Sequence, residues 1–204
     1  MSASRKGKRG ATLEPIILEP ADLFATRGRG WISKFIRFFT RSIGESRTKV
    51  NHVGVVTKGG TLRDAVVVEA LSRVRRHKLV ARYTGRRASD VAVFRAIDLT
   101  DDERQEIVQT AKSYVGRKYG YLKILTHVAD WVLQGAYVFR HLTRGNRYPI
   151  CSWLVAHAFK SAGKYFDVEP GAASPDDIWD FIQDHPDKYE TVVSLGPLSR
   201  FFSD

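Results

Sequence analysis

Two runs of β-branched residues constrain the fold of this chain more than any other feature. Residues 50–56 read VNHVGVV and residues 64–71 read DAVVVEAL, with TKGGTLR between them. Valine-rich runs on either side of a Gly-Gly pair are typical of a β-hairpin. We therefore expect an antiparallel pair of strands over 50–56 and 66–71, with its turn centred near Gly60 and Thr61.

Strands and helices are also expected on both sides of this hairpin. Residue spacing, turn residues and helix caps predict strands near 22–25, 90–99 and 190–195, and helices over 30–44, 101–116, 126–142 and 151–163 with a last one beginning at 175. Thr100 and Glu103 have the spacing of a capping box, and Ser174 followed by Pro175 is a second helix start. Strands and helices do not alternate, so the predicted fold class is α+β.

Length and charge limit the domain organisation. A chain of 204 residues suits one well-buried domain, which we expect over 14–204, preceded by a basic and disordered tail over 1–13. That tail contains no apolar run of the kind a secretory signal needs. The formal net charge of +11 favours encounters with phosphate, anionic lipid or acidic polymers.

Residues 30–44 form the most strongly amphipathic stretch. Their aromatic and aliphatic side chains fall at helical spacing, while Lys34, Arg37 and Arg41 lie on the other side. Such a helix either docks its aromatic face on the domain core or lies in an anionic membrane interface. Both uses stay open, with packing the commoner one.

Cysteine content and hydropathy indicate the compartment. No stretch approaches the ~20 apolar residues of a membrane-spanning helix. We therefore expect a cytoplasmic protein, and peripheral contact with a membrane stays open. The chain has a single cysteine, which excludes an internal disulfide and any zinc site built from several cysteines. We expect neither a metal nor a cofactor.

Cys151 is the first candidate for chemistry. Pro149 precedes it at a predicted helix start, so the thiol would lie at the positive end of a helix dipole, which favours the thiolate. A lone cysteine also packs often as a small apolar residue. The spacing alone leaves both interpretations open.

His52 and Glu69 complete a possible catalytic set. With the turn near Gly60, His52 lies directly opposite Glu69 and on the same face of the hairpin. A carboxylate beside an imidazole fixes its tautomer and stabilises its protonated form, as the base of a thiol hydrolase requires. A slip of one residue would separate the two side chains, so the inference depends on the turn.

The other candidate chemistries have weaker support in the sequence. The remaining histidines, which are His77, His127, His141, His157 and His185, are interpreted as surface or packing residues. No His/Asp/Glu group has metal-ligand spacing, no glycine pattern is typical of a phosphate loop, and Ser152 lacks the Gly-x-Ser-x-Gly turn. No nucleic-acid motif is recognised.

Several segments together resemble a known family, the circularly permuted NlpC/p60 papain-like cysteine hydrolases, which include lecithin:retinol acyltransferase-like proteins. The resemblance rests on EPADLFATRG, NHVGVV, VVVEAL, CSWLVAHAF and SPDDIWDFI, with the histidine strand ahead of the cysteine helix. It implies a small antiparallel β-barrel or sheet packed against helices. Ala21 stands where the family's Pro-Gly-Asp strand has glycine.

The same resemblance implies roles for the candidate residues. Cys151 is the expected nucleophile and a donor to the oxyanion hole through its N–H, His52 the general base, and Glu69 the residue that orients His52. The substrate would be an amide or ester, with peptidase or amidase action on peptidoglycan-type peptides first and lipid-directed acyl hydrolysis or transfer second. A non-catalytic basic module that binds membrane or nucleic acid is the alternative from another class.

Overall fold

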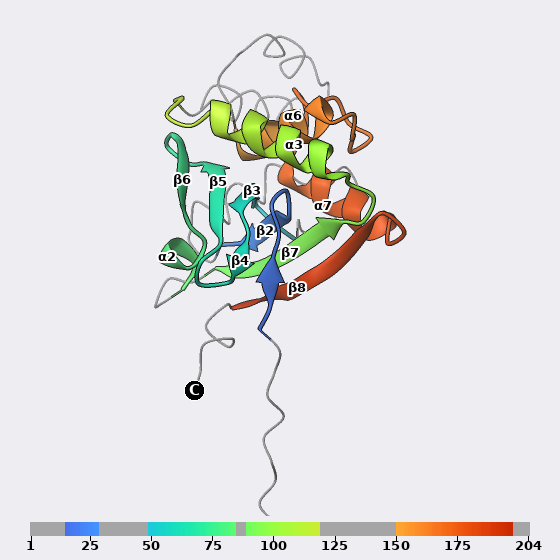
Figure 1. The fold of residues 1–204 in the computed structure, drawn as a ribbon. Helices are drawn as coiled ribbons and strands as arrows, with labels where there is room; N and C mark the ends of the chain where they lie inside the picture. Colours follow the sequence, from blue (N-terminus) through green and yellow to red (C-terminus); the bar gives the residue numbers. More distant parts are fainter. Residues whose placement is uncertain (1–14, 29–48, 85–88, 119–149, 198–204) are drawn as a thin grey trace, which may run out of the picture.

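The computed structural model describes residues 15–28, 49–84, 89–118 and 150–197. A six-stranded antiparallel sheet in the order β6-β5-β3-β2-β7-β8 forms its centre, and three helices pack over one side of it (Figure 1). A separate two-stranded sheet joins β1 to β4. The architecture is α+β, as the sequence predicts.

The elements have the following bounds. The strands are β1 Ile17–Leu18, β2 Leu23–Arg27, β3 His52–Lys58, β4 Gly60–Thr61, β5 Val66–Ala70, β6 Val74–Lys78, β7 Asp90–Ala96 and β8 Tyr189–Pro197, and the helices are α2 Val80–Tyr83, α3 Asp101–Ser113, α6 Cys151–Ser161 and α7 Pro175–Asp184.

Alternation along the strands divides the apolar residues between two faces. Val53 and Val55 belong to the larger core cluster, which includes the inward sides of α3, α6 and α7. Phe24 and Tyr83 belong to a second cluster on the opposite face, beneath α2. Because successive strand residues point to opposite faces, β3 contributes to both cores.

The sheet remains open. A closed barrel requires the first and last strands to pair with each other, whereas β6 and β8 are the two edges here. The expected barrel is therefore wrong and the expected sheet is confirmed. β6 carries Arg75, Arg76 and Lys78 on its exposed positions, and charged residues on an edge strand disfavour further strand pairing.

The predicted hairpin forms, with a different register. Val55 pairs with Val68 and Val56 with Val67, and the ladder shifts between Val56 and Lys58. Gly60 and Thr61 are not the centre of the turn, because they form β4 and pair with β1. The chain turns after Thr61, whose carbonyl accepts the N–H groups of Asp64 and Ala65.

The EPADLF segment fixes β2 against its neighbours. Ala21 adopts a φ of 69°, a left-handed conformation that favours glycine, which is the residue that the resembled motif has here. Asp22 is fully buried, and Arg95 donates to both of its carboxylate oxygens over 2.9 Å. This pair joins the start of β2 to β7.

The predicted caps are present. Thr100 and Glu103 form a reciprocal capping box at α3, and Ser174 caps α7 with Pro175 in its first turn. The tail over 1–13 and the helices expected over 30–44 and 126–142 lie outside the described residues. Within the part of the chain described, no helix is long and apolar enough to cross a membrane.

Candidate active site

Cys151 is the first residue of α6. Ile150 precedes it in an extended conformation and serves as the N-cap without a side-chain hydrogen bond. The helix is held by its apolar face, since Leu154, Val155 and Phe159 are fully buried in the larger core. Cys151, a residue that is 5% exposed, therefore lies at the end of a rigid helix where backbone N–H groups have no helical acceptor.

His52 begins β3 and lies between Cys151 and Glu69. Its Nε2 donates to the Glu69 Oε2 carboxylate oxygen. A second hydrogen bond joins the ring to Cys151, which leaves Nδ1 as the nitrogen available to the thiol. The three residues predicted from the sequence are thus brought together in the order Cys151, His52, Glu69.

The electrostatics of the site favour a thiolate and an imidazolium. Burial opposes charge on His52, but the Cys151 thiolate and the Glu69 carboxylate outweigh it and raise the pKa of His52 to about 10. Burial likewise opposes charge on Cys151, yet His52 and the N–H groups of Val53 and Ser152 lower the pKa of its thiol. Each charge therefore stabilises the other.

Glu69 is a fully buried carboxylate with several donors around it. Tyr83 Oη donates to Oε2 over 2.5 Å, His77 Nε2 donates to Oε1 over 2.6 Å, and Arg82 Nε lies 3.7 Å from Oε1. Burial would raise the pKa of Glu69, but His52, His77 and Tyr83 overcome that effect and hold it well below the usual range. Glu69 is therefore ionised and fixed in position.

Phe24 and Gly54 support the same arrangement from the neighbouring strands. Gly54 pairs with Phe24 across β2 and β3, and the Phe24 ring occupies the space that a side chain at 54 would need. The Phe24 ring meets Tyr83 edge-on at 5.6 Å between centroids and lies 6.4 Å from the His52 ring. Glycine at position 54 thus allows an aromatic ring to pack beside the site.

The interpretation of His77 as a surface or packing residue is wrong. β5 and β6 form a second hairpin in which Glu69 pairs with Arg75 and Val67 with His77, so His77 shares a face with Glu69. Counting across the turn at 71–73 gives this placement from the sequence. The sequence carries no signal for the role of Tyr83, because this residue belongs to α2, which is too short to show a helical pattern.

Two of the other histidines have the packing role that the sequence indicates. The centroid of the His157 ring lies 4.0 Å from that of Trp153, and the centroid of the His185 ring lies 4.0 Å from that of Phe181. His185 Nδ1 also donates a hydrogen bond to the carbonyl oxygen of Phe181. His127 and His141 lie outside the described residues. In the described ranges no group of three or more His, Cys, Asp or Glu side chains could hold a metal ion.

Comparison with known proteins gives no family for the chain. No protein-family model matches it, and no curated protein is similar to it. Among solved structures, the chain is similar to the crystal structure of the metalloprotein yiiX from Escherichia coli O157:H7, DUF1105, with 20% identity and a TM-score of 0.47. The alignment covers 86% of this chain and 88% of that one.

Proposed function

We propose that this chain is a cysteine hydrolase that acts through an acyl-enzyme, with Cys151 as nucleophile, His52 as general acid and base, and Glu69 as the residue that orients His52. The observation that carries the proposal is the continuous contact from the thiol to the imidazole to the buried carboxylate. A cysteine that served only as packing would need neither a charged partner nor a fixed histidine.

The first half of the reaction uses the charged pair. The Cys151 thiolate attacks the carbonyl carbon of an amide or ester, and the carbonyl electrons move to its oxygen. Backbone N–H groups at the start of α6, including that of Cys151, are donors for this oxyanion. His52 then gives its proton to the leaving amine or alcohol, and the thioester of Cys151 remains.

The second half regenerates the thiol pair. Neutral His52 takes a proton from water, and the hydroxide formed attacks the thioester carbonyl. Collapse of that intermediate releases the carboxylic acid and restores the thiolate beside the imidazolium. Glu69 keeps the Nε2 proton of His52 in place throughout, so Nδ1 is the nitrogen that exchanges a proton with substrate and water.

We also propose the permuted NlpC/p60 papain-like fold as the origin of this arrangement. The order of His52, Glu69 and Cys151 along the chain and the open antiparallel sheet under α6 support that assignment. Within it, an amidase or peptidase acting on peptidoglycan-type peptides is the preferred activity. The segment 30–44, on which peripheral lipid contact depends, lies outside the described residues.

Trapping of the acyl-enzyme tests the proposal. The full chain is incubated separately with cell-wall peptide and lipid extracts at neutral pH, and its intact mass is recorded at short times. We expect a thioester adduct on Cys151 from one pool, removed by hydroxylamine and absent in Cys151→Ala. His52→Ala should abolish the adduct without unfolding the chain, as circular dichroism checks. The absence of an adduct with both the cell-wall peptide extract and the lipid extract would contradict the proposed hydrolase.

A further inference from the structure

An open groove runs along the edge strand β6, beside the candidate active site. Its volume is about 510 Å³, and it extends from α2 to the segment that follows α3. The residues that line it include Arg73, Arg75, Arg76, His77 and Arg82. Neither Cys151 nor His52 is among them, so this arginine groove is distinct from the site of the thiol.

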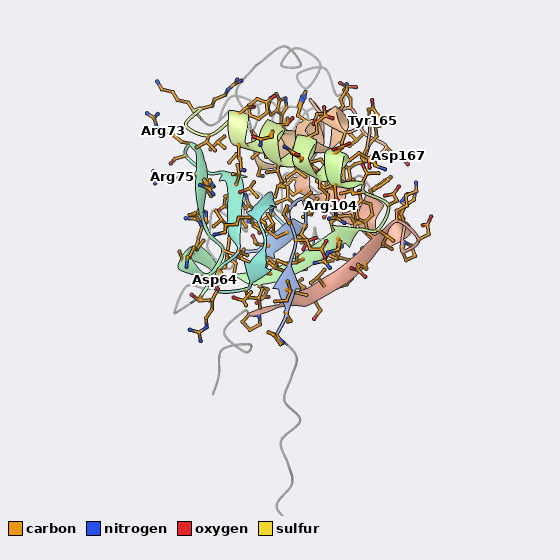
Figure 2. All side chains as sticks on the ribbon, in the orientation of Figure 1. Asp64, Arg73, Arg75, Arg104, Tyr165 and Asp167 are labelled. Atoms are coloured by element: carbon orange, nitrogen blue, oxygen red, sulfur yellow. The ribbon has the colours of Figure 1, made fainter. Side chains whose placement is uncertain are left out.

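Positive charge dominates the arginine groove. Four of its lining residues are arginines, and none of the described residues that line it is acidic. Arg82 lies near the buried Glu69, whereas Arg73, Arg75 and Arg76 form no ion pair with any described residue. Figure 2 shows Arg73 and Arg75 extending outward from the edge of the sheet, away from the other strands.

His77 adds a further positive charge at the inner side of the groove. Its Nε2 faces the Glu69 carboxylate at 2.6 Å, and its Nδ1 faces the carbonyl oxygen of Lys78 at 2.9 Å. Both partners are pure acceptors, so both ring nitrogens must donate, and the ring is an imidazolium. Two hydrogen bonds fix this cation, which gives the groove a preorganised charge besides its exposed guanidinium groups.

We propose that the arginine groove binds a small soluble phosphate-class oxyanion. Guanidinium groups present paired N–H donors whose geometry matches phosphate oxygens, and several of them together favour an anion with more than one negative charge. The groove carries four arginines and the His77 imidazolium, and Glu69 is the one described carboxylate that pairs with any of them, through His77 and Arg82, so the cluster carries excess positive charge until an anion binds. The inference does not depend on the proposed hydrolase.

Arg75 and Arg76 are the residues to change. Both are exposed and line the groove, and neither side chain makes a hydrogen bond or an ion pair with a described residue, so replacing these side chains should leave the fold intact. The matched control is Lys58→Gln with Arg63→Gln. It removes the same two charges from exposed positions outside the groove.

Isothermal titration of the full chain with inorganic pyrophosphate, in metal-free buffer at fixed ionic strength, tests the proposal. We expect saturable 1:1 binding, weakened by about tenfold or more in Arg75→Gln/Arg76→Gln and by less than about twofold in the control. No saturable binding to the wild-type chain would overturn the proposal, as would equal losses in the two double variants, which would indicate attraction by net charge alone.

A second arm separates a soluble anion from a lipid head group. Sedimentation with phosphatidylglycerol vesicles is compared with pure phosphatidylcholine vesicles. Vesicle binding that depends on Arg75 and Arg76, without pyrophosphate binding, would overturn the soluble ligand in favour of a membrane. Isothermal titration measures the heat of binding and needs no turnover. The affinity of Cys151→Ala for pyrophosphate should therefore equal that of the wild-type chain, whether or not the chain is a hydrolase.

Discussion

Glu69 meets His52 along a diagonal of the β3–β5 pair and not directly across it. Val55 pairs with Val68, and continuing that ladder places Gly54 opposite Glu69 and His52 two residues further along. An offset of two residues keeps both side chains on one face, because the side-chain period of a strand is two. Diagonal neighbours are ~7–8 Å apart at Cα, a distance that a glutamate and a histidine can bridge together.

The charged pair predicts an unusual pH profile for alkylation of the thiol. The pKa of Cys151 is lowered by His52, so its rate of reaction with iodoacetamide should level off at a lower pH than that of an ordinary thiol. In His52→Ala the rate should instead rise with pH as for an ordinary thiol of pKa ~8.5. At pH ~6.5 the wild-type chain should react about tenfold faster than the variant.

The chain's single cysteine makes this measurement direct, since each labelled molecule is labelled at Cys151. His185→Ala is the matched control, because His185 packs on Phe181 away from the thiol. Its profile should follow that of the wild-type chain. Profiles of the same shape in His52→Ala and the wild-type chain would contradict the thiolate–imidazolium pair.

Glu69 should couple stability to pH on the acid side. Its pKa is well below the ordinary 4.5, so the folded state gains stability from the carboxylate above the unfolded pKa and loses it as pH falls through the folded pKa. Glu69→Gln should cost about 3–5 kcal/mol at pH 7, because it leaves buried cationic partners uncompensated. The difference in melting temperature from the wild-type chain should shrink as pH falls below 4.5.

Glu106→Gln provides the comparison for that series, since Glu106 is exposed on α3. It should change the melting temperature little at any pH. A Glu69→Gln chain that melts with the wild-type temperature at pH 7 would show that the buried carboxylate contributes nothing to the fold.

The trio was predictable because each member has a local signal. A helix start places Cys151, and valine-rich strands place His52 and Glu69 on one face whenever their offset is even. The sequence does not show the register shift after Val56 or the pairing of Gly60 with β1, so the expected direct pairing of His52 and Glu69 was wrong by two residues. The contact between His52 and Glu69 still forms, because a register error of two residues leaves both side chains on the same face of the sheet.

The partners of Glu69 were harder to predict for a physical reason. His77 reaches the carboxylate only after β6 folds back on β5, and Tyr83 only after the four-residue α2 closes beneath the sheet. Those contacts are set by tertiary packing and leave no periodic pattern in the sequence. The choice between a barrel and an open sheet likewise depends on tertiary structure. A barrel forms only if β6 and β8 pair with each other, and the residue pattern of the strands does not determine whether they do.

Gly54→Ala should destabilise the fold and disturb the site. An added Cβ would lie 2.4 Å from Phe24 Cε1, 2.6 Å from Cζ and 2.9 Å from the Val68 carbonyl oxygen. Phe24 is fully buried, so its ring has no space into which to move. We expect a loss of about 1–3 kcal/mol in urea unfolding, together with slower alkylation of Cys151 because the ring supports His52.

Gly163→Ala separates this crowding from backbone strain. Gly163 has a φ of 72°, but an added Cβ there would meet no atom within 4 Å. The substitution should cost about 1 kcal/mol through strain alone and leave alkylation unchanged. Equal effects of the two alanine variants on alkylation would show that Phe24 does not position the histidine.

Arg95→Gln should be among the most destabilising changes outside the site. Burial raises the pKa of Asp22 even though Arg95 opposes that shift, so the carboxylate depends on the guanidinium for compensation. Removal of Arg95 leaves that carboxylate buried without its bidentate partner, at a cost of about 3–5 kcal/mol. The double variant Asp22→Asn/Arg95→Gln should recover part of this loss, since it removes the uncompensated charge.

Urea unfolding of the single and double variants measures the coupling between Asp22 and Arg95. Arg104→Gln is the control, because Arg104 pairs with the partly exposed Glu19, and this substitution should cost under about 1 kcal/mol. Strictly additive losses would contradict a coupled pair and leave β2 and β7 joined by their backbone ladder alone.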